Sequence, residues 1–326
     1  MRRLSHRAEA LPIRGAFTIS RGSRTETLAV VCEIEEGGAI GRGECVPYPR
    51  YGESVESVSE QIDSIAASVA EGADRAALQG LLPAGAARNA VDCALWDLEA
   101  KSSGVRAWDL IGMPAPDGIV TAYTLSLDEP ARMADAARAA ADRPVLKIKL
   151  GGAGDTERVA AVREAAPRAR LIVDANEGWG AAELEARITA MAELGVALVE
   201  QPLPAADDAA LARIERAVPV CADESCHDRV SLERLAGRYD YINIKLDKTG
   251  GLTEALALVD EAERRGFGIM VGCMLSSSLA MAPAMMVAAR ASFVDLDGPL
   301  LLARDREPGI RYEGSIMRTP PSELWG

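Results

Sequence analysis

The chain has 326 residues, of which 48% are hydrophobic and 26% are charged, as expected for a soluble globular protein of one or two domains. Its 49 acidic and 36 basic residues give a net charge of −13, which repels phosphate backbones and anionic lipid. No stretch approaches the roughly 18 apolar residues that a membrane span needs, and the basic N-terminus leads into no apolar signal segment. We therefore expect a cytoplasmic protein with no nucleic-acid or membrane partner.

Residues 1–115 predict an α+β domain. The segments 27–35 and 39–45 are β-rich and flank a Gly-Gly turn, which is the pattern of a hairpin. A helix is expected over 88–101, where apolar residues recur at helical spacing on one face. We expect the C-terminal residues 305–326 to pack back on this domain.

Residues 116–304 alternate short β-rich runs with Ala/Glu/Arg-rich helical patterns, and eight such runs occur. Eight βα units predict an α/β fold of the (β/α)8 barrel type better than an open doubly wound sheet. The runs are Thr121–Leu127, Val145–Leu150, Arg170–Asn176, Ala197–Pro202, Pro219–Ser225, Tyr241–Asp247, Gly268–Leu275 and Phe293–Asp297.

The only histidines are His6 and His227, and we expect His227 to be a loop residue. A zinc site built from several histidines is therefore excluded. The six cysteines form no CxxC pair and are expected to be reduced core residues. Acid–base chemistry is thus expected to come from lysines or carboxylates.

Two lysines share one face of the second run. Because strand side chains alternate, Lys147 and Lys149 lie opposite the apolar face, which must pack against the helices. Both ammonium groups are then predicted to point into the barrel at the C-terminal end of the strand, where barrel active sites lie. The same alternation places Lys245 inside a later strand.

Three successive runs carry an acid at the corresponding late position, namely Asp174, Glu200 and Asp223. Charged groups are costly inside a protein unless they are paired or bind a metal, and three converging carboxylates would repel one another. A hard cation such as Mg²⁺ suits an all-oxygen set, so we predict one Mg²⁺ per subunit. The repetition of the pattern argues against edge-strand charges or solvated loop residues.

These residues belong to a set of motifs that resembles the muconate-lactonising subgroup of the enolase superfamily. The motifs are Lys147-x-Lys149, Asp174-Ala-Asn176, Glu200-Gln-Pro, Ala222-Asp223-Glu-Ser and Asn243-Ile-Lys245. That subgroup joins an α+β capping domain to a modified (β/α)8 TIM-type barrel, so the resemblance covers nearly the whole chain. Asp295-Leu-Asp297, Gly272-Cys273 and the segment 47–52 are most similar to the dipeptide epimerases that act on L-Ala-D/L-Glu.

The resemblance implies an isomerase that inverts the α-carbon of the second residue of the dipeptide by proton transfer between two bases, through an enediolate. The three carboxylates would bind Mg²⁺, as enolase-superfamily sites with a lysine or histidine base do. Lys149 and Lys245 would be the bases on opposite sides of the barrel. Lys147 would lower the pKa of Lys149 by its like charge and could contact the substrate carboxylate. Recycling of cell-wall muropeptides is the implied pathway.

Substrate recognition falls to residues outside the catalytic set. Asp295 and Asp297 share a face of the last strand and would bind the α-ammonium of a dipeptide; the alternative is a helix cap or a solvated turn. Arg21 and Arg24 lie in a loop where family members carry a mobile specificity loop, and either could bind the glutamyl carboxylate. Thr124 is a further substrate-binding candidate.

Three more residues complete the expected site. Cys273 is a candidate substrate contact, while Asn176 and Asp247 are expected to orient a metal ligand and a lysine respectively. A packing role for Asn176 and Asp247 stays open.

Two other functions compete with the epimerase. An o-succinylbenzoate synthase or N-acylamino-acid racemase would share the fold, metal and lysines, but its substrates lack the ammonium that the two late aspartates would bind. A noncatalytic binding barrel would leave two buried lysines without a task. The expected partner is a small dipeptide, and the chain could form a homo-oligomer.

Overall fold

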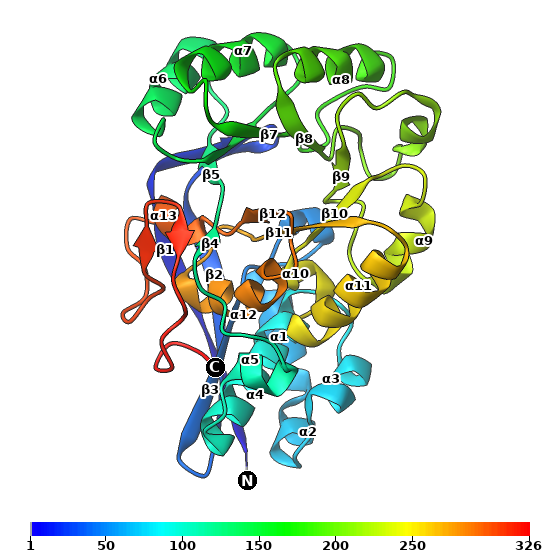
Figure 1. Ribbon diagram of the computed structural model, residues 1–326. Helices are drawn as coiled ribbons and strands as arrows, with labels where there is room; N and C mark the ends of the chain where they lie inside the picture. The colour runs from blue at the N-terminus through cyan, green and yellow to red at the C-terminus, as the bar shows by residue number, and fades with distance from the viewer. Residues whose placement is uncertain (1) are drawn as a thin grey trace.

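A three-stranded antiparallel sheet opens the computed structural model, which describes residues 2–326 (Figure 1). Its strands β1 (Arg3–Ile19), β2 (Gly22–Glu36) and β3 (Ala39–Cys45) follow one another in chain order. The tight turn between β2 and β3 places Gly37 and Gly38 at φ of 60° and 88°, the left-handed region that hairpin turns favour. The predicted hairpin is therefore present; β3 has the expected bounds, and β2 begins earlier than the segment expected from the sequence.

Helices cover one face of this sheet, and with it they form the capping domain. They are η1 (Pro49–Tyr51), α1 (Val55–Ser64), α2 (Ala66–Ala70), α3 (Arg75–Leu81), α4 (Ala86–Ser103) and α5 (Ala107–Ile111). Helix α4 lies so close to β3 that a Cβ added at Gly43 would be 2.1 Å from the carbonyl oxygen of Ala90. The small residue at this position is therefore required for the helix to pack on the sheet.

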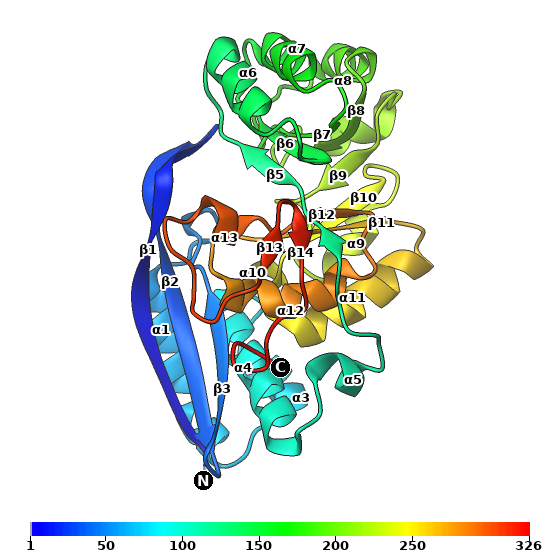
Figure 2. The same cartoon turned by 60° about the vertical axis from the view of Figure 1, so that its left-hand side comes forward.

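The second part of the chain is a barrel of eight parallel strands (Figures 1 and 2). The strands are β5 (Tyr123–Leu125), β6 (Val145–Lys149), β7 (Arg170–Asp174), β8 (Val196–Glu200), β9 (Val220–Ala222), β10 (Tyr241–Ile244), β11 (Gly268–Gly272) and β12 (Phe293–Asp295). They are hydrogen-bonded in chain order, and the Ala122 amide donates to the Val294 carbonyl (2.8 Å) where β5 meets β12. The predicted barrel with an N-terminal capping domain is confirmed.

Helices surround the barrel and fill the space between it and the capping domain. They are α6 (Pro130–Ala139), α7 (Asp155–Ala165), α8 (Leu184–Glu193), η2 (Ala209–Arg213), η3 (Arg229–Ser231), α9 (Leu232–Leu235), α10 (Leu246–Thr249), α11 (Leu252–Arg264), α12 (Ser278–Ala288) and α13 (Gly298–Leu301). Every residue of α12 is buried, which matches its almost wholly apolar sequence. Among residues 2–326, no helix combines the length and the apolar character that crossing a membrane requires.

The chain ends in a small sheet and a tail that touch both parts. Strand β14 (Ile316–Met317) pairs with β13 (Tyr312–Glu313) on one side and with β4 (Ile119–Val120), the strand that precedes the barrel, on the other. The indole of Trp325 donates to the Cys93 carbonyl in α4 at 3.0 Å. The Arg306 guanidinium pairs with the buried carboxylate of Glu44 in β3 at 2.6 Å. These contacts hold the C-terminal residues against the capping domain.

Apolar residues fill the barrel interior toward the N-terminal ends of its strands, and polar residues occupy the C-terminal ends. One buried cluster of inward side chains closes the interior: Ala122, Ile172, Leu198, Cys221, Met270 and Phe293. Except for Met270, which Gly272 follows, each of these residues lies two positions before a polar inward residue, so the polar groups gather at the C-terminal ends of the strands. All six cysteines are unpaired, and five of them are buried.

Candidate active site

Strand β6 points both of its lysines into the barrel, as the alternation predicts. Lys147 is 1% exposed, and its Nζ lies 2.6 Å from Asp295, 2.7 Å from Glu200 and 3.2 Å from Asp174. Burial alone would lower the pKa of Lys147, but these carboxylates raise it well above its usual value. Lys149 lies nearer the mouth and donates to Asp174 at 2.6 Å.

Asp174 and Glu200 are the last residues of adjacent strands, and the register of the sheet sets Lys149, Asp174 and Glu200 side by side. Burial opposes ionisation of both carboxyls. The two lysines of β6 nevertheless hold the pKa of Asp174 below its usual value, whereas burial and the Asp174 charge raise the pKa of Glu200 to about 7. The two acids are therefore close neighbours whose pKa values are shifted in opposite directions.

Asp223 follows β9 and receives two ammonium groups. Lys245, at the end of β10, donates to Oδ2 at 2.7 Å, and Lys248 donates to Oδ1 at 2.6 Å. Burial would raise the pKa of Asp223, but these two charges hold it well below its usual value. Because β6 and β10 are four strands apart in a ring of eight, Lys149 and Lys245 reach the site from opposite sides.

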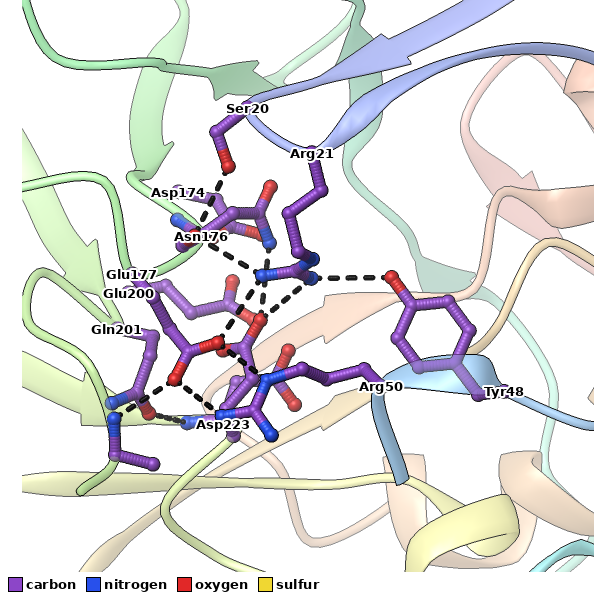
Figure 3. A network of polar contacts seen from close by, with 12 residues as sticks. Ser20, Arg21, Tyr48, Arg50, Asp174, Asn176, Glu177, Glu200, Gln201 and Asp223 are labelled. Atoms are coloured by element: carbon purple, nitrogen blue, oxygen red, sulfur yellow. Dashed lines mark hydrogen bonds and ion pairs between the residues drawn. The ribbon is translucent and has the colours of Figure 1, made fainter. Parts of the chain in front are cut away.

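The loops that follow β7 and β8 leave the ordinary backbone regions beside these carboxylates. Asn176, Glu177 and Gln201 have φ of 46°, 66° and 34°, which residues other than glycine seldom adopt. The turn lets the Asn176 amide donate to Asp174 Oδ1 at 2.9 Å. The side-chain oxygen of Gln201 accepts from the Asp223 amide at 2.9 Å. Both contacts are made through a backbone amide and fix the loop beside an acid of the site, while the orienting role expected for the Asn176 side chain stays a prediction (Figure 3).

The carboxylate end of the site fits a hard cation. Three buried side-chain oxygens at this end make no hydrogen bond among the described residues, namely Asn176 Oδ1, Glu224 Oε2 and Asn243 Oδ1, and a fourth, Glu200 Oε2, is met only by the Lys147 ammonium at 2.7 Å. Buried acceptors without a partner are rare in proteins, and an oxygen-binding ion would satisfy such a set. The acids themselves are turned toward lysines, and in residues 2–326 no group of three acids, histidines or cysteines already has the spacing of metal ligands. Ion binding would therefore require these side chains to exchange partners.

The opposite end of the site carries the two late aspartates. Asp295 accepts from Lys147, and Asp297 Oδ2 accepts from the Thr124 amide at 2.6 Å. Burial and the neighbouring Asp295 raise the pKa of Asp297 to about 7. Thr124 Oγ1 lies 3.4 Å from Asp295 Oδ1. Asp297 and Thr124 line a small cavity together with Cys273 and the three lysines of β6 and β10.

That cavity is narrow, with a volume of about 30 Å³, and Phe17 of β1 forms part of its wall. Phe17 also lines a second cavity of about 460 Å³ beside the β1–β2 turn, to which Arg24 contributes. A third cavity, of about 480 Å³, lies by Phe293 and the linker before the barrel. None of the three inward lysines lines it, so its size does not make it the reactive site.

The two arginines of the β1–β2 turn differ in their surroundings. Arg21 contacts Glu224 at 2.9 Å and the Asn176 carbonyl at 3.1 Å. Arg24 makes no ion pair with any described residue; its guanidinium lies 5.8 Å from the ring centre of Phe17. Burial without an acidic partner lowers the pKa of Arg24.

One expected site residue has other partners. Asp247 does not contact a lysine in the described structure. It accepts from the Val46 amide at 3.1 Å and from Asn89 Nδ2 at 2.9 Å, both in the capping domain. The prediction failed because β10 ends at Ile244 and α10 then replaces the strand alternation. His227 lies in a loop, as expected, with its Nε2 3.2 Å from the Glu224 carbonyl.

Sequence reasoning missed Lys248, Glu224 and Glu177. Lys248 comes three residues after Lys245, and the one-turn helix α10 brings it back toward Asp223. The Gly-Gly pair that follows could have signalled that turn. Glu224 is distinguished in the sequence only as the neighbour of Asp223 in its motif, and no pattern in the sequence points to Glu177.

Comparisons with known proteins assign the chain to a family. Residues 1–112 match the mandelate racemase/muconate lactonizing enzyme N-terminal domain, and residues 131–307 match the enolase C-terminal domain-like family. The chain is 52% identical over 306 residues to an L-Ala-D/L-Glu epimerase from Escherichia coli, covering 93% of this chain and 95% of the relative. It is 44% identical over 299 residues to an N-acetyl-D-glutamate racemase from Pseudoalteromonas, covering 91% and 95%.

One solved structure is similar to this chain over its whole length. It is an enolase family member from Agrobacterium tumefaciens with homology to dipeptide epimerases, with bound sodium, L-Ala-L-Glu and an ordered loop. That chain is 57% identical and superposes with a TM-score of 0.98 over 100% of both chains. With both domains of the family present in order, this chain belongs to the enolase superfamily, in its mandelate racemase/muconate lactonizing enzyme group.

Proposed function

We propose that this protein is an Mg²⁺-dependent L-Ala-D/L-Glu epimerase. The observation that carries the proposal is that Lys149 and Lys245 line one cavity from opposite sides of the barrel, next to the acids. Inversion of a carbon centre needs a base on one face and an acid on the other, and this pair supplies both. The named activity of the relative from Escherichia coli supports the same reaction.

A proton beside a carboxylate is removed with difficulty because the resulting enediolate carries two negative charges. Asp174, Glu200 and Asp223 would hold Mg²⁺, which supplies charge neutralisation at the substrate carboxylate when bound. Solved dipeptide epimerases hold Mg²⁺ together with a dipeptide, which supports this assignment. The ammonium of Lys147, kept charged by its carboxylate neighbours, adds fixed positive charge beside Lys149.

In the reaction, one lysine takes the α-proton of the second residue and the other returns a proton to the opposite face. Each lysine starts in contact with an acid, Lys149 with Asp174 and Lys245 with Asp223. When those acids turn toward the ion, the lysines lose these partners and are free to face the substrate. For a substrate of the opposite configuration, the lysine that donated the proton becomes the base and the other lysine becomes the acid.

The substrate's free amine would bind at the aspartate end. Asp297 and Asp295 are buried, and an ammonium would supply the countercharge that the pair lacks once Lys147 turns to the substrate carboxylate. The second candidate is racemisation of an N-acylated glutamate, which the relative from Pseudoalteromonas favours. An acylated nitrogen brings no positive charge to these two acids, so we place the dipeptide first.

Of the two arginines, we assign the glutamyl carboxylate to Arg24. Arg21 is already held by Glu224, whereas Arg24 has no acidic partner in the described chain and adjoins the cavity next to Phe17. A buried guanidinium of this kind gains from a bidentate carboxylate. Arg24→Gln is expected to lower kcat/KM for L-Ala-L-Glu by about 100-fold, and that for L-Ala-L-Gln by less than threefold. Equal losses would return the assignment to Arg21.

The activity itself is tested by following the α-proton of the glutamyl residue by NMR in D₂O. We expect the signal of L-Ala-L-Glu to disappear and L-Ala-D-Glu to form in the presence of Mg²⁺. If the α-proton of N-acetylglutamate exchanges rapidly with D₂O while the dipeptides do not react, the second candidate is established instead. Action on muropeptide fragments in the cytoplasm, and assembly into a homo-oligomer, stay predictions.

A further inference from the structure

The closed site is too small for its substrate. A cavity of about 30 Å³ holds a few water molecules, whereas a dipeptide is several times larger. Part of its wall is Phe17, which belongs to the capping domain rather than the barrel. Movement of the β1–β2 hairpin, which carries Phe17, away from the barrel would open this wall of the cavity, so the contacts that hold the hairpin down affect how readily substrate enters.

Two arginines of the capping domain reach across to the barrel (Figure 3). Arg21, at the hairpin turn, contacts Glu224, the Asn176 carbonyl and, at 3.4 Å, Glu177. Arg50 lies in η1, and its Nε and Nη2 donate to the two oxygens of Glu177, each at 2.8 Å. The hydroxyl of Tyr48 accepts from Arg21 at 3.1 Å and so connects the two segments.

Glu177 is the residue where these contacts converge. Its carboxylate also accepts from the Ala205 amide at 2.8 Å, so both of its oxygens are engaged by the protein. The side chain is 11% exposed, and Arg50 and the Ala205 amide help hold the pKa of Glu177 below its usual value although burial opposes this. The left-handed backbone of Glu177 directs the side chain toward the capping domain, whereas Asp174, three residues earlier, points into the barrel.

We propose that Glu177 is a positioning residue that keeps the hairpin closed over the substrate by holding Arg50 and Arg21. The proposal rests on the function proposed above, in which the same hairpin places Arg24 on the substrate. Glu177 itself does not touch the substrate, because its oxygens are already used. Opening of the hairpin separates Arg21 from Glu177 and Glu224. Because Arg50, in η1, fixes the Glu177 carboxylate from the other side, loss of either Glu177 or Arg50 is expected to weaken the closed state.

Tryptic cleavage of the full-length, Mg²⁺-loaded protein tests the contact without any substrate. The hairpin turn offers two bonds to trypsin, after Arg21 and after Arg24. In the closed state the Arg21 guanidinium is held by Glu224 and that of Arg24 lies over Phe17, so neither side chain is free to enter the specificity pocket of the protease. We expect Glu177→Gln and Arg50→Gln to be cut there at least fivefold faster than the wild type, as quantified by mass spectrometry. Glu183→Gln is the matched control, since Glu183, on the surface of the barrel domain, pairs at 2.7 Å with Arg187 of α8 and not with the capping domain. If the two variants are cut at both bonds at the same rate as the wild type, the proposal is overturned.

Steady-state kinetics supply the second measurement. Because saturating substrate restores the closed state, Glu177→Gln should raise KM for L-Ala-L-Glu about tenfold and leave kcat within twofold. The double variant Glu177→Gln/Arg50→Gln should have the same KM as the single variants, since each substitution breaks the same Glu177–Arg50 pair. A fall in kcat with KM unchanged would mean that Glu177 acts on Asp174 and not on the hairpin. If the wild type proves inactive on dipeptides, the proposed function fails while the cleavage rates still decide the role of Glu177.

Discussion

The ammonium of Lys248 lies directly behind Asp223, where it donates to both the carboxylate Oδ1 and the backbone carbonyl of that residue at 2.6 Å. A third donation goes to the Asn243 carbonyl at 3.0 Å, so all three protons are used and the lysine is fully buried. Lys248 is thus fixed in place, and it holds one oxygen of Asp223 while leaving the other to Lys245 or to an ion.

Lys248→Met should therefore weaken Mg²⁺ binding. A residue that orients a metal ligand typically contributes 10- to 100-fold in affinity, and we expect a loss of that size by isothermal titration calorimetry. Lys101→Met is a suitable control, because Lys101 forms a similar 2.7 Å pair with Asp97, which lies in α4 of the capping domain. Tighter binding in Lys248→Met would show that the lysine opposes the ion by charge and does not orient its ligand.

Metal removal is expected to abolish activity and lower the melting temperature, because the carboxylates then lose the ion that compensates them. The pKa of Glu200, raised to about 7 in the metal-free protein, adds a pH dependence. Mg²⁺ binding must displace the proton of Glu200, so Mg²⁺ affinity should be higher at pH 8 than at pH 6. Calorimetric titrations in buffers of different ionisation enthalpy measure the number of protons released. Asp223→Asn should behave like chelation. Full activity after exhaustive EDTA treatment would remove the Mg²⁺ assignment.

Asp297→Asn should impair dipeptides selectively. We expect kcat/KM for L-Ala-L-Glu to fall about 10- to 100-fold, since a charged hydrogen bond to the ammonium is lost, and that for an N-acylated glutamate to change little. Similar losses for both substrates would give Asp297 another role.

The same aspartate predicts a pH profile. Its pKa is raised to about 7, so the ionised form that binds an ammonium accumulates only as the pH rises through about 7, and kcat/KM of the wild type should rise with it. The sign for stability is the reverse. Between about pH 4 and 7 the native state keeps a proton that the unfolded chain has released, so this group lowers the free energy of unfolding as pH rises. Both dependences should be weaker in Asp297→Asn, in which Glu200, whose pKa is also raised to about 7, still titrates in this range.

The barrel could be predicted because its strands repeat, and alternation within β6 was enough to place Lys147 and Lys149 inside. The same rule failed where the strands ended. It put Asp247 beside a lysine, although α10 begins at Leu246 and turns Asp247 to the capping domain and Lys248 to Asp223. Glu177 could not be found either, because its partners Arg21 and Arg50 lie more than a hundred residues away and meet it only through the docking of the two domains.

The last prediction separates the two bases, and it follows from their placement on opposite faces of one planar enediolate. Lys149→Ala should abolish α-proton exchange of the epimer whose proton faces β6, while Lys245 still exchanges the proton of the other epimer; Lys245→Ala should show the mirror pattern. From the family resemblance we expect Lys149 to act on L-Ala-L-Glu and Lys245 on L-Ala-D-Glu. Net epimerisation should fall by about 10²- to 10⁴-fold in both variants, the usual contribution of a general acid or base. Deuterium incorporation from D₂O, measured separately with each epimer, decides the matter. If either single variant still interconverts the epimers at a rate near that of the wild type, the two lysines are not the acid and base of this reaction.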